Sequence, residues 1–235
     1  MAIRGVLFDK DGTLIDVTGT WVPVYREMLA ELMKAGPVEI DAIMAKAGYE
    51  PTTGGFRAGS TLAGGTTREL IDIWWPGLSD AEAWEKVRVL DIDYRNLAIK
   101  HLKPLMALTP VLEELKALGL RLGVATNDTE YSARNHMVEL GVADHFDIII
   151  GADSVSRPKP AGDMIHAFAA ATGLEPHEIA MVGDNSHDIE TARAGGAGLA
   201  IAVLSGNAAH GDIAHLADHT LASIAELPQL LRRLS

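Results

Sequence analysis

The chain has 235 residues, with 20 basic and 32 acidic side chains, a formal net charge of -12 and no cysteine. This acidic balance argues against a general nucleic-acid-binding protein, which usually presents a basic face. The lack of cysteine excludes disulfides, thiolate catalysis and zinc–thiolate sites. The length suits one large α/β core, or a core with a small second lobe.

Targeting and membrane segments are not expected. The N-terminal apolar run is soon interrupted by Asp9, so it lacks the long uncharged segment of a signal peptide. The longest stretch without Asp, Glu, Lys or Arg, residues 194–211, is broken by glycines and polar residues, and it is shorter than the roughly 20 apolar residues of a membrane helix. We therefore expect a cytoplasmic protein with no membrane partner.

The first predicted element is a buried strand over residues 6–8, which is followed by two aspartates, Asp9 and Asp11. A nucleophile or a Mg²⁺ ligand at the carboxyl edge of a parallel sheet needs this placement. Gly12 suits the sharp turn that comes next, because glycine tolerates positive φ. Taken alone, Asp-x-Asp-Gly is also ordinary turn and helix-cap chemistry. A second acidic motif further along the chain is needed to favour a catalytic or metal-binding role over an ordinary turn or helix cap.

A long helical region comes next. Helical patterning is found over residues 21–35, 38–47, 66–75 and 79–99, with breaks that contain Gly or Pro, and no strand is predicted among them. The glycine-rich stretch 54–65 lacks the Gly-Lys-Ser/Thr ending of a nucleotide P-loop and is predicted to be a flexible loop. One strand followed by such a helical region indicates an inserted lobe.

From about residue 110 the pattern alternates between helix and strand, which is typical of a parallel sheet with helices on both faces. The strands are predicted over residues 120–125, 146–150, 179–182 and 199–203. His210, His215 and His219 have a spacing that permits metal binding, but no strand is predicted to deliver them. Spacing without structural context is weak evidence for a metal site.

Polar side chains follow the strand over residues 120–125. Thr126 and Asn127 offer hydroxyl and amide donors at a position where a phosphoryl oxygen can rest. Further along, Lys159 lies between two prolines. Prolines restrict the local backbone, so this loop is suited to position one ammonium group.

Acidic side chains follow the strand over residues 179–182, as they follow the first strand. Asp184 comes directly after a glycine, and Asp188 is four residues further on. A helix that begins near Ser186 would place Asp188 in its first turn, so the two carboxylates can point the same way. Such an arrangement suits one hard cation with oxygen ligands.

These residues together resemble the haloacid dehalogenase-like phosphohydrolase superfamily, and within it the phosphoglycolate phosphatase-like branch. Four motifs of that superfamily occur in order: Asp9-Lys10-Asp11-Gly12-Thr13, Thr126-Asn127, Lys159, and Gly183-Asp184 with Asp188. An ordered match of four motifs is far more specific than any single motif. The resemblance implies a Rossmann-like parallel sheet with helices on both faces, formed by residues 1–15 and 106–235. It also implies an inserted helical cap domain, formed by residues 16–105.

The resemblance further implies a role for each polar residue. Asp9 would be the nucleophile that forms an aspartyl-phosphate, and Asp11 would be the general acid and base. Thr126 and Asn127 would hold phosphoryl oxygens. Lys159 would neutralise the charges of Asp9 and of the phosphate.

A bound Mg²⁺ is part of the same resemblance. Its ligands would be the carboxylates of Asp9 and Asp184 and the backbone carbonyl of Asp11, with Asp188 supporting the metal shell. These roles make physical sense, because a carboxylate attacks a phosphate dianion only when nearby cations cancel the repulsion between the two anions. Asp11 must be protonated to release the alcohol and deprotonated to activate water.

The expected function is that of a Mg²⁺-dependent phosphatase whose partner is a small phosphorylated metabolite, with phosphoglycolate as the leading candidate from the resemblance. Arg57, in the glycine-rich stretch, is predicted to contact the part of the substrate beyond the phosphate, because a guanidinium pairs well with a carboxylate. The alternative for Arg57 is an exposed loop arginine without such a role. The oligomeric state is left open between monomer and homodimer.

Other functions remain open within the resemblance. A phosphomutase similar to β-phosphoglucomutase would keep every core residue named above, and a phosphonatase of the same superfamily would differ in its cap. A dehalogenase would need neither Asp11 nor a metal at Asp184, so the presence of these two residues argues against that function. A catalytically silent binding protein with this fold is expected to have lost one of the core residues Asp9, Asp11, Lys159 or Asp184, and all four are present.

Overall fold

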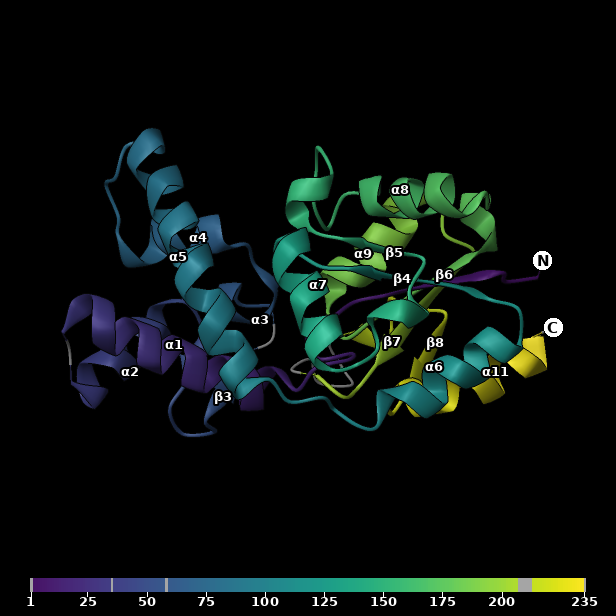
Figure 1. The fold of residues 1–235 in the computed structure, drawn as a ribbon, viewed down its shortest axis with the longest axis horizontal. Helices are drawn as coiled ribbons and strands as arrows, with labels where there is room; N and C mark the ends of the chain where they lie inside the picture. Colours follow the sequence, from purple (N-terminus) through teal and green to yellow (C-terminus); the bar gives the residue numbers. More distant parts are fainter. Residues whose placement is uncertain (1, 35, 58, 207–212, 235) are drawn as a thin grey trace. The chain divides into compact units, whose positions relative to one another are not determined.

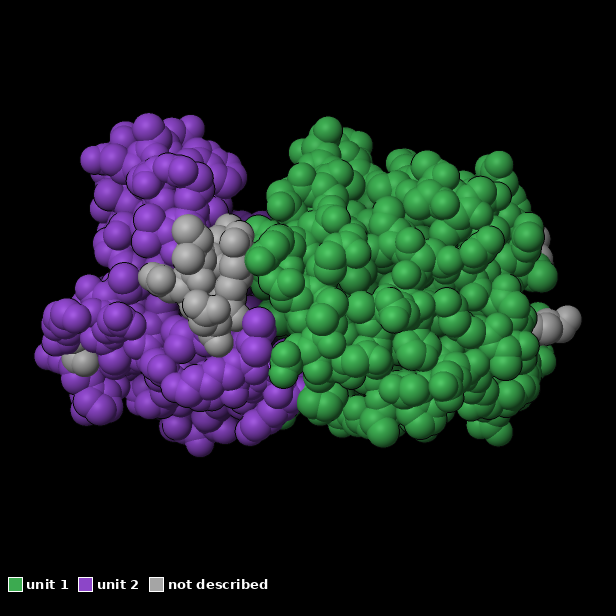
Figure 2. All heavy atoms as spheres, viewed as in Figure 1, with its two compact units in different colours: residues 1–16, 104–235 green, residues 17–103 purple. Residues whose placement is uncertain are grey.

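Two compact units make up the computed structural model of the chain, which describes residues 2–34, 36–57, 59–206 and 213–234, without the side chains of residues 91–96. Unit 1 consists of Met1–Asp16 and Pro104–Ser235, and unit 2 consists of Val17–Lys103 (Figure 2). Unit 2 is therefore inserted into the chain of unit 1. Within unit 1 the two sides of the insertion point are hydrogen-bonded, because the N–H of Leu105 donates to the carbonyl of Leu14 at 3.1 Å.

Unit 1 is built on a six-stranded parallel sheet with the order β5-β4-β1-β6-β7-β8 (Figure 1). The strands are β1 Gly5–Phe8, β4 Arg121–Ala125, β5 Ile148–Ile150, β6 Ile179–Gly183, β7 Leu199–Val203 and β8 His219–Leu221. From β1 the chain runs outward through β4 to β5, and it then returns to the other side of β1 to add β6, β7 and β8. Sheets of this kind bind ligands outside the carboxyl ends of the strands where the order reverses. The ends of β1, β4 and β6 are therefore the expected place for a site.

Helices cover both faces of this sheet. They are α6 Leu108–Ala117, α7 Glu130–Glu139, α8 Asp163–Thr172, α9 Ser186–Gly195 and α11 Leu227–Leu234, with short 3-10 helices at Ala143–His145, Ala152–Ser154, Pro176–Glu178 and Ile224–Glu226. On one face, Phe168 of α8 and Ile189 of α9 share a buried apolar cluster with Leu7 of β1. α6 and α11 lie together on the side of the sheet opposite α8 (Figure 1). The predicted α/β fold class is confirmed.

Unit 2 is mostly helical. Its elements are α1 Val17–Met33, α2 Pro37–Lys46, β2 Tyr49–Glu50, β3 Gly55–Phe56, α3 Thr61–Gly64, α4 Thr67–Trp74 and α5 Asp80–His101. Aromatic rings hold its core together, with the ring of Tyr25 at 5.7 Å from Trp21, 6.0 Å from Phe56 and 5.8 Å from Trp74 between centroids. Such edge and stacked pairs stabilise a core beyond the burial of their area.

Three local expectations were wrong. The region between the first strand and residue 105 does contain strands, because β2 and β3 pair as a short antiparallel hairpin. The stretch 54–65 is not only a loop, since it includes β3 and the single helical turn α3. His219 is carried by a strand, β8, which pairs in parallel with β7, whereas His210 lies outside the described residues.

Among the helices described, none has both the length and the apolar character that a bilayer span requires.

Candidate active site

The candidate site begins at the carboxyl end of β1. The N–H of Asp9 donates to the carbonyl of Val182 in β6 at 2.8 Å, so the sheet pairing continues up to this residue. The chain then turns at Gly12, whose φ of 92° lies in the left-handed region that glycine tolerates. A Cβ at Gly12 would also lie 2.4 Å from Oδ2 of Asp184. Both the turn and the close approach to Asp184 therefore require glycine.

Asp184 and Asp188 are delivered by β6 and α9. Asp184 follows the last residue of β6, and Asp188 lies in the first turn of α9, which Asn185 caps, as the sequence predicts. Oδ2 of Asp188 accepts from the N–H of Asn185 at 3.1 Å, so the start of the helix fixes this carboxylate. Position 183 also requires glycine, because a Cβ at Gly183 would lie 2.2 Å from the carboxylate of Asp188.

Lys159 joins two of these acids. Its Nζ lies 2.5 Å from Oδ1 of Asp9 and 2.6 Å from Oδ1 of Asp188, and all three residues are buried. Burial opposes the charge on Lys159, but attraction to Asp188 and Asp9 outweighs this cost and raises the pKa of Lys159 above its ordinary value. The ammonium is therefore charged at neutral pH.

Asp9, Asp184 and Asp188 form the one group of three or more possible metal ligands within the described part of the chain. Each offers one carboxylate oxygen, and these oxygens lie within 4.8 Å of one another. Oδ2 of Asp9 is buried and has no hydrogen-bond partner among the described residues. Burial raises the pKa of Asp9 to about 7, since the effect of Lys159 in lowering it is not sufficient to offset burial and the nearby acids Asp188 and Asp11. A hard divalent cation would satisfy Oδ2 and favour the ionised form.

Thr126 and Asn127 follow β4 and reach the same edge of the sheet. The N–H of Thr126 donates to the carbonyl of Ile150 at 3.0 Å, and its hydroxyl accepts from the N–H of Asp128 at 3.1 Å. Asn127 donates through Nδ2 to the carbonyl of Lys159 at 3.3 Å. The loop after β4 is thereby tied to the loop that carries Lys159.

Asp11 lies beside this group of acids, and its carboxylate is not a member of it. Its Oδ2 lies 2.9 Å from Nζ of Lys10, which is completely buried. The same ammonium donates to Asp128 at 3.0 Å and lies 3.2 Å from Nδ1 of His136 on α7. Sequence reasoning gave no role to Lys10, Asp128 or His136. One signal was available, because Lys10 alternates with Asp9 and Asp11 directly after a strand and is therefore expected to point elsewhere.

The buried ammonium of Lys10 and its neighbours shift one another's pKa values. Burial opposes the charge of Lys10, but attraction to Asp11 and Asp128 raises its pKa above the ordinary value. Burial would raise the pKa of Asp128, and the positive charge of Lys10 reverses the shift, so that this pKa is lowered. Burial, helped by the charge of Lys10, lowers the pKa of His136 to about 4. The imidazole is therefore neutral at pH 7.

Arg57 belongs to unit 2 and is not among the residues that unit 1 brings together. Its N–H donates to the carbonyl of Gly48 at 2.8 Å, and its carbonyl accepts from the N–H of Ser60 at 3.1 Å. Its side chain is exposed. The backbone of this segment is thus fixed within unit 2, while the guanidinium faces solvent.

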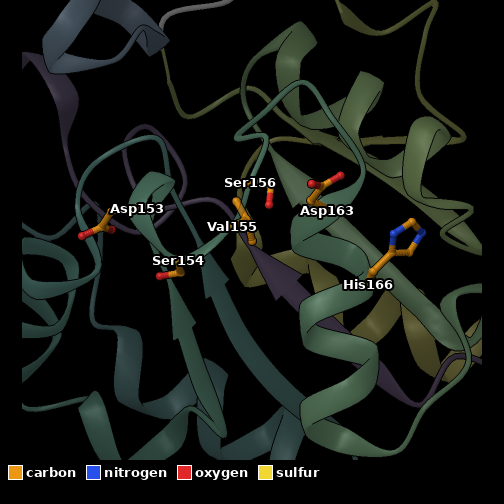
Figure 3. Close-up of a pocket in the computed structure, with 6 residues that line it drawn as sticks. All are labelled: Asp153, Ser154, Val155, Ser156, Asp163 and His166. Carbon is orange, nitrogen blue, oxygen red and sulfur yellow. The ribbon is translucent and has the colours of Figure 1, made fainter.

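An open groove elsewhere on unit 1 contains none of the predicted site residues (Figure 3). It lies between the segment around the 3-10 helix Ala152–Ser154 and the first turns of α8. Its lining residues are Asp153, Ser154, Val155, Ser156, Asp163 and His166. Asp163 is already held by Arg157, whose Nη2 donates to it at 2.7 Å.

Comparison with known proteins shows the family to which the chain belongs. The model of the haloacid dehalogenase-like hydrolase family matches residues 6–202. A phosphoglycolate phosphatase of Chromobacterium violaceum is 31% identical over 231 residues, which cover 98% of this chain and 97% of that protein. A phosphoglycolate phosphatase of Neisseria meningitidis is 31% identical over 196 residues, which cover 83% of this chain and 77% of that protein.

Solved structures share the fold. The crystal structure of CbbY from Rhodobacter sphaeroides in complex with phosphate superposes with a TM-score of 0.71 and 20% identity, covering 96% of each chain. At this identity the similarity bears on the fold alone, and the assignment to a family rests on the sequence matches. The chain belongs to the haloacid dehalogenase-like hydrolases, in the phosphoglycolate phosphatase-like branch, and it is a phosphatase of phosphoric monoesters.

Proposed function

We propose that the chain is a Mg²⁺-dependent phosphatase that hydrolyses a small phosphate monoester through an aspartyl-phosphate on Asp9. The observation that carries this proposal is the buried group formed by Asp9, Asp184 and Asp188, with Lys159 bonded to two of the three acids. Three buried carboxylates next to one ammonium leave an excess of negative charge. Such an excess is costly unless a cation compensates it.

The metal would be held by Asp9, Asp184 and the backbone carbonyl of Asp11, with Asp188 fixed behind them by Lys159 and by the N–H of Asn185. Its ligands are then all oxygen atoms, as Mg²⁺ prefers. When bound, Mg²⁺ supplies positive charge that offsets the repulsion between Asp9 and the phosphate and stabilises the charge of the transition state.

Asp9 starts the first half of the reaction. One of its carboxylate oxygens attacks phosphorus, and the bond from phosphorus to the ester oxygen breaks. Asp11, protonated at this stage, gives its proton to that oxygen, so the alcohol leaves neutral. Thr126 and Asn127, which follow β4, would hold the phosphoryl oxygens, and Lys159 would balance the charge of the attacking carboxylate.

Water completes the second half. Asp11, now a carboxylate, takes a proton from water while the water oxygen attacks phosphorus of the aspartyl-phosphate. The bond from phosphorus to Asp9 breaks, which restores the carboxylate of Asp9 and releases inorganic phosphate. Asp11 ends protonated and ready for the next substrate, so protons balance over the cycle.

Phosphoglycolate is the substrate that we propose first, because both relatives described above are named phosphoglycolate phosphatase. Its carboxylate would pair with the exposed guanidinium of Arg57. Changing Arg57→Ala should then lower kcat/KM for phosphoglycolate by roughly 10-fold or more, the usual size of a charge-assisted hydrogen bond. Arg88→Ala, which removes another exposed arginine of unit 2, is the matched control. An unchanged kcat/KM in the Arg57 variant would exclude Arg57 from substrate binding.

The experiment that tests the proposed function is a measurement of phosphate release from a panel of esters, with Mg²⁺ and with EDTA. The panel contains phosphoglycolate, sugar phosphates and nucleotides, and the Asp9→Asn variant serves as the blank. Metal-dependent release that is concentrated on one ester supports the proposal and identifies the substrate. Release that is unaffected by EDTA or retained in the variant contradicts it. If no ester is hydrolysed, the proposal fails, and a sugar-phosphate isomerisation assay then tests the mutase alternative.

We also infer a cytoplasmic location.

A further inference from the structure

Lys10 is a completely buried lysine that the proposed reaction does not use. It lies between Asp9 and Asp11 in the chain, and none of its surface is exposed. Burying an ammonium group is costly unless it is paired and hydrogen-bonded. In the proposed reaction, the charge of Asp9 is already balanced by Lys159, which lies on a different loop. A second buried cation, next to Asp9 in the chain, therefore needs its own explanation.

The partners of Lys10 come from three separate places in unit 1. Nζ lies 2.9 Å from Oδ2 of Asp11, 3.0 Å from Oδ2 of Asp128 and 3.2 Å from Nδ1 of His136. An ammonium has three N–H donors and no acceptor, so Nδ1 of His136 accepts in this contact. These three acceptors lie in different parts of the chain, and all three are within hydrogen-bond distance of the one ammonium.

Two of these partners are held firmly. Oδ1 of Asp128 accepts from the N–H of Thr129 at 2.7 Å, and Thr129 caps α7. His136 lies on α7 itself and is 1% exposed. Asp11 is different, because it lies on the loop after β1 and directly precedes the turn at Gly12. The ammonium thus connects a well-anchored side, formed by Asp128 and His136, to a carboxylate whose charge acts on Asp9.

We propose that Lys10 is a positioning residue that holds the carboxyl group of Asp11 for its work as general acid and base. The inference rests on the proposed function, in which Asp11 protonates the leaving alcohol. Among the three partners named above, Asp11 is the one to which the proposed reaction gives a task, and proton transfer requires its oxygen to lie within hydrogen-bond reach of the ester oxygen. Removing the ammonium removes a fixed contact of this carboxylate, so we expect its position to be less well defined.

The inference predicts a selective defect. An alkyl phosphate such as phosphoglycolate has a poor leaving group that needs the proton of Asp11, whereas p-nitrophenyl phosphate releases a stable phenolate without it. kcat/KM reports the steps up to the first irreversible one, which here is transfer of the phosphoryl group to Asp9. Comparing kcat/KM for the two substrates therefore isolates the acid step from later hydrolysis. A merely structural role for Lys10 would lower both values equally.

The variant to measure is Lys10→Met combined with Asp128→Asn. Lys10→Met alone would leave the largely buried carboxylate of Asp128 without the cation of Lys10, which is expected to destabilise the protein. The asparagine removes that charge and keeps an oxygen that can accept from the N–H of Thr129. Lys116→Met, at an exposed lysine of α6, is the matched control for loss of one positive charge. Asp11→Asn is measured alongside as the reference for loss of the acid.

In the double variant we expect kcat/KM for the alkyl phosphate to fall about 10-fold or more, within the range that acid–base catalysis contributes, and kcat/KM for the aryl phosphate to stay within about 3-fold of the wild-type value. The retained aryl activity also shows that the variant is folded. An equal loss with both substrates, or no loss with either, overturns the inference. If the double variant does not fold, Asp128→Asn alone takes its place, with a smaller selective loss expected and an equal effect on both substrates contradicting the inference.

Failure of the proposed function would look different. If Asp11→Asn itself shows no selective loss with the alkyl substrate, Asp11 is not the general acid, and the proposed mechanism is wrong. If Asp11→Asn is selective and the Lys10 variants are not, the mechanism stands and the role of Lys10 is wrong.

Discussion

Lys159 and Asp9 form a buried ion pair, with Nζ of Lys159 2.5 Å from Oδ1 of Asp9. The same ammonium lies 2.6 Å from Oδ1 of Asp188, so it keeps a partner when Asp9 is changed. Substitutions at Asp9 therefore test its chemistry without leaving a buried lysine unpaired, which would otherwise be strongly destabilising.

The first prediction concerns Asp9→Asn. An amide oxygen is neutral and does not attack phosphorus, so turnover should fall by at least about 10³-fold, as with the loss of other catalytic nucleophiles. The fold should persist, with circular dichroism and Tm close to those of the wild type. Hydrolysis by the purified variant at more than about one thousandth of the wild-type rate would contradict the assignment of Asp9 as nucleophile.

The second prediction concerns Asp11→Asn. We expect kcat/KM for alkyl phosphates to fall by about 100-fold and kcat/KM for aryl phosphates to fall much less, since only the former need a proton on the leaving oxygen. Initial rates with both substrates, measured at saturating Mg²⁺, give the comparison. Equal slowing of both reactions would count against the acid role.

The third prediction concerns metal binding. A ligand that binds only the folded protein stabilises it by about 2.7 kcal/mol at 100 times its Kd, so Mg²⁺ should raise Tm and EDTA should reverse the rise. Asp184→Asn should abolish this shift. Without metal the variant should be at least as stable as the wild type, because one of three crowded carboxylates has lost its charge. A Mg²⁺-induced rise in Tm that survives in the variant would remove Asp184 from the metal site.

The fourth prediction concerns Gly206. A Cβ at this position would lie 1.8 Å from Oδ2 of Asp184, so Gly206→Ala must displace that carboxylate. We expect Mg²⁺ affinity, measured by calorimetry, to fall by about 10-fold or more, as for other changes that disturb the orientation of metal ligands. Gly55→Ala is the control, because the nearest atom to its new Cβ would be 3.6 Å away. Unchanged Mg²⁺ affinity in the Gly206 variant would show that Asp184 does not bind the metal in this position.

The fifth prediction concerns His136 and pH. The unfolded imidazole takes up a proton below its ordinary pKa of 6.5, whereas burial and the charge of Lys10 lower the folded pKa to about 4. Acidification from pH 6.5 to 4 therefore favours the unfolded state, by up to about 3 kcal/mol. His136→Gln offers Lys10 an oxygen acceptor and cannot titrate, so the free energy of unfolding should fall less across this window than in the wild type. Parallel pH profiles for the two proteins would refute the assignment.

The sequence was sufficient to predict the strands that carry the candidate site, because their signals are local. β1 and β6 are apolar runs that end at aspartates, and the start of α9 follows from the residues just after Asp184. The hairpin of β2 and β3 was missed because each strand has two residues, too few for an alternating pattern. β8 was missed because only three residues pair with β7.

The contacts of Lys10 could not be predicted in the same way. Its partners Asp128 and His136 are 118 and 126 residues away in the chain, and no periodic pattern links them to it. The need for glycine at position 206 is equally hidden, since it depends on the position of the carboxylate of Asp184 in space. Long-range pairing and close approach depend on the folded sheet, whereas motif residues are visible before folding is considered.

The hydrogen bond between Leu14 and Leu105 has a consequence for the evolution of the family. A backbone hydrogen bond within unit 1 already holds together the two chain segments that flank the insertion. The two ends of unit 2 therefore connect to points of unit 1 that lie close to each other. Long insertions between two such points cost little conformational entropy beyond that of a short connection. Mutations could therefore replace or remodel the inserted module while the phosphate chemistry is inherited unchanged, so that new substrates require no new catalyst.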